Sequence, residues 1–239
     1  MPLAEQAGLM RMLTIEVLEM SLAQCRAWRD TGLDVTVAVN LAASDLLDLA
    51  FPDQVRGLLC QYGLPPSALE LEITETTLMR DLVRSAAVLG ELRELGVQIA
   101  VDDYGTGYSS LAYLQELPVD ILKMDRSFVT KLEDGSRARR QKAEAIVRST
   151  IGLAHELGLR IVVEGVDSAS TLAKLRNYGC DLAQGYFIGR PRPADEVTPM
   201  LTVPAPTPVP APAPAGVAGP AAVAMSPSAA AVLTPPVQC

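Results

Sequence analysis

The sequence predicts an α/β fold, a TIM-like (β/α) barrel in which six strands can be recognised. Short β-branched and aliphatic runs alternate with stretches of helical periodicity between residues 1 and 201. Strands that alternate with helices in this way form a parallel sheet, because each helix returns the chain to the start of the next strand. In addition, a polar residue stands at or near the end of each predicted strand, where the loops of a barrel gather.

The individual elements follow from spacing and from turn residues. A first helix is predicted from Leu3 to Trp28, because Leu9, Leu13, Val17 and Met20 recur at helical spacing, and Gly32 closes it. A second helical stretch opens at Ser44 and ends at Gly63, with an interruption at Pro52. Further helices are predicted at 81–95 and 144–157, and strands at 34–40, 68–73, 97–101, 119–124, 160–163 and 181–186.

The chain divides into two regions. Residues 1–201 form the predicted barrel domain, and residues 202–239 are a tract of proline, alanine and valine. Alternating prolines lack the amide donors of a helix or a sheet, so this tail is predicted to be disordered or extended. We expect an inert tail; a spacer or a ligand for a proline-reading module is the alternative.

Composition excludes several classes of protein. The formal net charge of −8 argues against binding of a nucleic-acid polymer through its phosphates. No apolar run reaches membrane-spanning length, and the first residues lack a leader pattern. The cysteines are scattered without metal or redox spacing, which favours a reduced, cytoplasmic setting: Cys25, Cys60, Cys180 and Cys239. The single histidine, His155, is expected to be a surface or packing residue.

Asp102 and Asp103 directly follow a predicted hydrophobic strand and precede a loop that contains Gly105 and Gly107. Adjacent carboxylates repel each other, and apolar surroundings increase that repulsion. A divalent metal relieves it, although an acidic turn would also explain the pair. The other strand ends favour the metal, because they too carry oxygen ligands of the kind that Mg²⁺ or Mn²⁺ prefers. Together these strand-end residues are Asn40, Glu72, Asp102, Asp103, Lys123, Glu164 and Gln184.

Five segments, in order along the chain, resemble the EAL-domain family. They are LEITE (71–75), DDYGTGYSSL (102–111), LKMDRSF (122–128), EGV (164–166) and GCDLAQGY (179–186). The resemblance runs from Pro2 to Pro193 and implies a metal-dependent phosphodiesterase that opens cyclic di-GMP to pGpG. It also implies cyclic di-GMP as the ligand, and it is compatible with a homodimer.

The resemblance also implies a role for each residue. The expected ligands of two Mg²⁺ or Mn²⁺ ions are Asn40, Glu72, Asp102 and Asp103. Lys123 is expected to contact the attacking water, and Glu164 to act as the general base. Asp167 and Gln184 are expected to line the substrate site, and Glu75 to steady the loop after Asp103. A salt bridge is the alternative for Lys123, and a helix N-terminal cap is the alternative for Glu75.

The sequence also departs from the family pattern. The Glu-x-Leu strand that names the family, which carries a metal ligand, and the strand before it are not found ahead of Pro2. The barrel is therefore expected to be incomplete at its N-terminus, with about six of eight strands. Asp167 stands where the family usually has a longer glutamate. Extra basic residues, Arg137, Arg139 and Arg140, are expected to form a solvated loop, with a partner-docking patch as the alternative.

Two hypotheses of different classes follow. In the first, the chain is part of a cyclic di-GMP phosphodiesterase and is weak or inactive alone, because one metal-ligand strand is missing. In the second, it is a degenerate EAL module that binds cyclic di-GMP or another protein without cleaving anything. Retention of Lys123, Glu164 and both aspartates favours the first hypothesis, and the missing strand favours the second.

Overall fold

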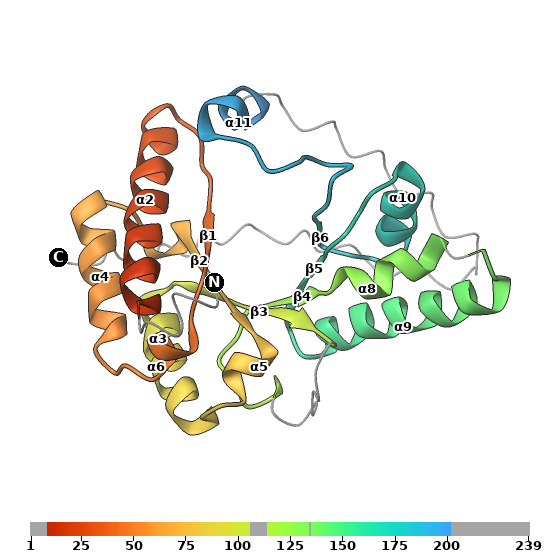
Figure 1. Cartoon of the computed structure of the whole chain (residues 1–239), viewed down its shortest axis with the longest axis horizontal. Coiled ribbons are helices and arrows are strands. Elements are labelled where there is room, and N and C mark those ends of the chain that lie inside the picture. Colours follow the sequence, from red (N-terminus) through yellow and green to blue (C-terminus); the bar gives the residue numbers. More distant parts are fainter. Residues whose placement is uncertain (1–8, 106–113, 134, 202–239) are drawn as a thin grey trace, which may run out of the picture.

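A computed structural model of the chain describes residues 9–105, 114–133 and 135–201. Within these residues, six parallel strands form one sheet in the order β1-β2-β3-β4-β5-β6. The sheet curls into an incomplete barrel, with helices on its outer side (Figure 1). The two edges of the described sheet are β1 and β6. The predicted TIM-like architecture with six strands is confirmed.

The six strands lie within a few residues of the predicted ranges, whereas α9 begins earlier than the predicted 144–157. The strands are β1 (Val37–Asn40), β2 (Leu69–Thr74), β3 (Gln98–Tyr104), β4 (Ile121–Met124), β5 (Arg160–Val163) and β6 (Leu182–Ala183). The longer helices are α2 (Met10–Asp30), α4 (Phe51–Tyr62), α6 (Leu82–Leu95), α9 (Arg137–Glu156), α10 (Ala169–Asn177) and α11 (Ala194–Leu201). The short helices are α3 (Ala43–Leu46), η1 (Pro66–Ala68), α5 (Glu75–Leu78), α8 (Arg126–Val129) and η2 (Thr130–Glu133).

Local signals explain several of these bounds. Gly63 follows α4 with φ +61° and Gly96 follows α6 with φ +96°, the left-handed conformation that ends a helix. Asp81 caps the start of α6, because its carboxylate accepts the amide hydrogen of Arg84 at 3.1 Å. The end of α11 is held against α2, where Trp28 Nε1 donates to Thr198 Oγ1 at 2.8 Å.

The sheet separates an apolar outer face from a polar inner face. On β2, Leu69, Leu71 and Ile73 are fully buried in the main core, which the sheet forms with the surrounding helices. Glu70 and Glu72 alternate with them and therefore point to the opposite face. That inner face holds a separate small apolar cluster of Ala100, Ile121 and Val162. The carboxylates and the lysine described below extend beyond this cluster toward the ends of the strands.

Two features differ from expectation. The apolar residues that predict the first helix, from Leu9 to Met20, lie largely on its exposed side, whereas Leu18, Leu22 and Cys25 form the buried side. The expectation of a basic loop around Arg137 is wrong, because these residues form the first turn of α9. Ser136 precedes them in the extended conformation of an N-cap residue, and exposure of Arg137 and Arg139 allows the helix to begin there. The proline-rich tail lies outside the described residues.

Candidate functional site

Lys123 lies at the centre of a cluster of three carboxylates on the inner face of the sheet. Its Nζ atom is 2.7 Å from Glu72 Oε1, 2.9 Å from Glu164 Oε1 and 3.2 Å from Asp102 Oδ1. The lysine side chain is only 4% exposed, and the side chains of its three partners are 11 to 21% exposed. An ammonium group buried in this way requires nearby acceptors, and each of these carboxylates supplies one.

Four consecutive strands deliver these residues to one place. Glu72 lies on β2, Asp102 on β3 and Lys123 on β4, while Glu164 directly follows β5. The amide of Glu164 donates to the carbonyl of Met124 at 3.1 Å, which continues the pairing of β4 with β5 past the last strand residue. The strands are parallel, so their C-terminal ends meet at the same rim, as in the active sites of β/α barrels.

Burial and the neighbouring charges shift the pKa values of the residues in this cluster. Burial alone would lower the pKa of Lys123, but hydrogen bonds from its ammonium to Glu72 and Glu164, and the charge of Asp102, raise that pKa well above its usual range. Burial also raises the pKa of Glu164, although Lys123 opposes this effect. With one cation among three carboxylates, the four groups carry a formal charge of −2 when they are ionised. Such a pocket favours the addition of positive charge.

Asn40 and Asp103 stand beside this cluster. Asn40 is the register partner of Glu72 across the pair β1-β2, which places the two residues on neighbouring strands at the same level. Asp103 is the one described non-glycine residue with positive φ, at +56°, and its amide donates to Asp102 Oδ1 at 3.0 Å. This left-handed residue lies where the register between β3 and β4 shifts. Burial, with the nearby charges of Asp102 and Asp125, raises the pKa of Asp103.

The two predicted substrate residues lie on adjoining segments beyond the strand ends. Asp167 and Gln184 are both exposed. The carbonyl of Gln184 accepts the amide hydrogen of Val166 at 3.0 Å, so the segment after β5 is tied to the segment after β6. These contacts bring both residues to the rim that carries Lys123 and Glu164. Their predicted contact with substrate stays a prediction.

Glu75 occupies a different environment. It is 6% exposed and lies in the first turn of α5. Its carboxylate adjoins a small apolar pocket lined by Leu78, Met79, Val101, Tyr104, Leu114 and Leu117. Its Oε2 atom has no hydrogen-bond partner among the described residues. The loop that Glu75 is expected to steady extends into residues 106–113, which are outside the described residues, so this role stays a prediction.

The donor chemistry of the cluster suits a hard divalent cation, because every candidate ligand offers carboxylate or amide oxygen. Among the described residues, however, no group of three or more His, Cys, Asp or Glu side chains is arranged as a metal site. The Lys123 ammonium already lies among the three carboxylates that a cation would attract. The assignment of Asn40, Glu72, Asp102 and Asp103 as metal ligands therefore stays a prediction.

Sequence reasoning did not identify two places where segments around the site approach each other closely. Glu133 contacts hydroxyl groups at the start of α10, 35 to 38 positions further along the chain. A β-carbon added to Gly165, which has φ +72°, would lie 2.4 Å from Arg126 Cβ. Neither close approach has a local sequence signal, because each joins segments that only the barrel fold brings together.

No helix within the described residues is long and apolar enough to cross a bilayer.

Comparisons with known proteins agree with this geometry. The EAL domain profile matches residues 1–191. The chain is 42% identical over 190 residues to the cyclic di-GMP phosphodiesterase PA2567 of Pseudomonas aeruginosa, covering 80% of this chain and 32% of that protein. It is 41% identical over 198 residues to the bifunctional diguanylate cyclase/cyclic di-GMP phosphodiesterase MucR of the same organism, covering 82% and 28%. The chain thus spans about a third or less of the length of these relatives.

Two solved structures extend the comparison. The structure titled as the PaMucR phosphodiesterase in complex with c-di-GMP has a TM-score of 0.75 and 42% identity, with 82% of this chain and 78% of that chain covered. The FimX EAL domain of Pseudomonas aeruginosa bound to c-di-GMP has a TM-score of 0.71 and 26% identity, with 79% and 73% covered. From the matched profile, the identities and the shared fold, the chain belongs to the EAL-domain family.

Proposed function

We propose that this chain binds cyclic di-GMP at the rim of its sheet and hydrolyses it to pGpG with the help of divalent metal ions. The observation that carries the proposal is the convergence of Glu72, Asp102 and Glu164 on Lys123 from separate strands. A purely structural sheet does not require four buried or half-buried charged groups at one rim, because burying charges is costly. Two relatives with phosphodiesterase in their names share more than 40% of residues with this chain.

Under this proposal, Asn40, Glu72, Asp102 and Asp103 hold Mg²⁺ or Mn²⁺. When bound, such ions lower the pKa of a coordinated water and neutralise phosphate charge. Lys123 supplies a buried positive charge close to the phosphodiester. Glu164 takes up the proton of the attacking water, a role suited to a carboxylate whose pKa is raised by burial. Asp167 and Gln184 contact the nucleotide from the segments after β5 and β6.

The second candidate is binding of cyclic di-GMP without hydrolysis. Two observations favour it. Lys123 neutralises part of the carboxylate cluster, and within the described part of the chain no group of three or more His, Cys, Asp or Glu side chains is arranged as a metal site. A chain that keeps this arrangement would retain a nucleotide pocket and lack the activated water. In a sensor or interaction role, the rim would then serve binding alone.

Product formation separates the two candidates. The purified chain is incubated with cyclic di-GMP and Mn²⁺, pGpG is quantified by chromatography, and nucleotide affinity is measured in parallel. Hydrolysis is expected to be slow but measurable, and Glu164→Gln should reduce it by about 100-fold or more while binding is kept. The exposed Glu156→Gln serves as the matched control and should behave like the wild type. Binding without product in every variant would support the sensor, and absence of binding would contradict both candidates.

A further inference from the structure

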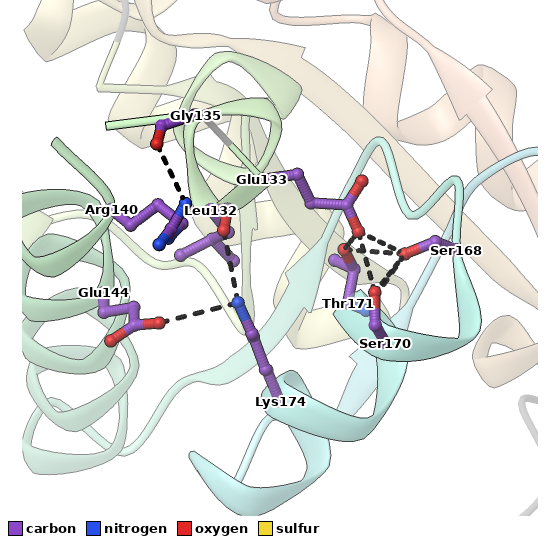
Figure 2. Close-up of polar contacts among 9 residues, drawn as sticks. All are labelled: Leu132, Glu133, Gly135, Arg140, Glu144, Ser168, Ser170, Thr171 and Lys174. Carbon is purple, nitrogen blue, oxygen red and sulfur yellow. Dashed lines mark hydrogen bonds and ion pairs between the residues drawn. The ribbon is translucent and has the colours of Figure 1, made fainter. Parts of the chain in front are cut away.

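A single carboxylate oxygen joins η2 to the start of α10. Three hydroxyl groups lie within hydrogen-bond distance of Glu133 Oε1: Ser168 Oγ at 2.5 Å, Thr171 Oγ1 at 2.8 Å and Ser170 Oγ at 2.9 Å (Figure 2). Ser168 is also the N-cap of α10, because its Oγ accepts the amide hydrogen of Thr171 at 3.1 Å. Glu133 therefore holds the first turn of this helix from outside the helix itself.

The physical chemistry of this junction stabilises an ionised Glu133. The hydrogen bonds from the three hydroxyls hold the pKa of this exposed carboxyl below its usual range. The carboxylate also lies at the N-terminus of α10, where the helix dipole favours negative charge. A second tie lies one turn further along α10, where Lys174 donates to the carbonyl of Leu132 at 3.2 Å and pairs with Glu144 at 3.5 Å (Figure 2).

The segment between β5 and α10 is thus held at both ends. At its start, the amide of Glu164 is bonded to the carbonyl of Met124, and the Glu164 carboxylate contacts Lys123. At its end, Ser168 contacts Glu133. Asp167 directly precedes Ser168 and is exposed. Asp167 thus lies between Val166, whose amide donates to the carbonyl of Gln184, and Ser168, which contacts Glu133, so Glu133 fixes its C-terminal side. The position of Glu164 depends on β4.

We propose that Glu133 is a positioning residue that holds Asp167 toward the nucleotide site by fixing the start of α10. The role of Asp167 rests on the proposed function, whereas the fixing of the segment by Glu133 does not. Loss of the tie should release residues 167–171 and weaken nucleotide binding. The chemical step should change little, because Glu164 keeps its contacts with β4 and Lys123.

The test compares Glu133→Ala with the conservative variant Glu133→Gln. All three hydroxyls contact the same oxygen, so the carbonyl oxygen of glutamine, which has two lone pairs, can keep most of these hydrogen bonds. Glu144→Ala is the matched control, because Glu144 lies at the same junction and pairs with Lys174 instead of the hydroxyls. Amide hydrogen exchange of residues 165–171 is measured for all proteins, together with KM and kcat for cyclic di-GMP and, in a Glu164→Gln background, its Kd.

Glu133→Ala should speed exchange in 167–171 and raise KM and Kd by about tenfold, with kcat within about twofold of the wild type. Glu133→Gln should restore most of the protection and affinity, and Glu144→Ala should match the wild type. Unchanged exchange in Glu133→Ala, or a fall in kcat with KM and Kd unchanged, would overturn the proposal. If the wild type does not bind cyclic di-GMP, the proposed function fails, and the exchange data alone then decide whether Glu133 fixes the segment.

Discussion

Lys123 on β4 reaches across the intervening strand β3 to Glu72 on β2, with 2.7 Å between Nζ and Oε1. The same ammonium contacts Asp102 on β3 and Glu164 after β5, so one side chain connects four successive strand ends. This lysine is therefore a structural element of the barrel as well as a candidate functional group. The consequences for folding and for cation binding can be measured separately.

Removal of the Lys123 charge should destabilise the fold. Lys123→Met leaves three carboxylates close together without a cation, and breaking a buried ion pair in this way costs about 3 kcal/mol or more of unfolding free energy. Urea unfolding at pH 7 measures the change. Lys142→Met, at an exposed position on α9, should alter stability by less than about 0.5 kcal/mol. Equal stability of the two variants would show that the cluster contributes little.

The same substitution should strengthen cation binding. The ammonium of Lys123 neutralises the carboxylates that a divalent ion would need, so its removal increases the attraction for Mn²⁺. We expect Lys123→Met to bind Mn²⁺ at least about tenfold more tightly than the wild type, at a temperature where both are folded. Isothermal titration calorimetry gives both constants. Weaker binding by the variant would mean that the lysine supports the cation site instead of competing for it.

Gly165 should be less tolerant of alanine than Gly158. Both have φ +72°, so each substitution carries a similar backbone strain of about 1 kcal/mol. Only at Gly165 would the added β-carbon meet a neighbour, Arg126 Cβ at 2.4 Å, whereas nothing lies within 4 Å at Gly158. Gly165→Ala should therefore be the more destabilising change in thermal or urea unfolding. Similar losses from the two variants would argue against a close approach of the loops after β4 and β5.

Asp45 should give a pH-dependent contribution to stability. This fully buried carboxylate accepts hydrogen bonds from Thr14 and from the amide of Ala42, both at 2.8 Å, and its Oδ1 has no partner among the described residues. Burial raises its pKa despite these hydrogen bonds. Because the pKa is higher in the folded state, the contribution of Asp45 is fully present below the unfolded pKa and is lost as pH rises through the folded pKa.

Asp45→Asn should remove this dependence. Relative to the wild type, the variant should gain unfolding free energy between pH 4 and pH 7, a trend that urea titrations at several pH values would detect. Asp195→Asn, at an exposed position in α11, should not follow the same trend. A constant difference between Asp45→Asn and the wild type over this pH range would contradict the expectation.

Much of the fold could be predicted because its signals are local. Alternating apolar runs, the left-handed glycine Gly63 and the cap Asp81 mark elements that the structure confirms within a few residues. The start of α9 was missed, because three arginines in a first turn oppose the helix dipole and suggest a loop. The sequence could not predict that the apolar side of α2 is exposed either, since periodicity predicts a helix without indicating which side is buried.

The candidate site also has features that the sequence predicts and features that it does not. The convergence of Glu72, Asp102, Lys123 and Glu164 was predictable, because parallel strands bring their C-terminal ends to one rim. The direct salt bridges of Lys123 were foreseen only as an alternative to a functional role. The tie from Glu133 to the start of α10 depends on tertiary geometry alone, and no spacing in the sequence indicates it.

Calorimetric titration of the chain with Mn²⁺ tests the central claim most directly: the carboxylates around Lys123 form a cation pocket. Wild-type protein is expected to bind Mn²⁺, Glu72→Gln and Asp102→Asn to lose about tenfold or more in affinity, and the exposed Glu91→Gln to bind like the wild type. Binding that is unaffected by Glu72→Gln and Asp102→Asn, or no binding by the wild type at millimolar Mn²⁺, would contradict the account.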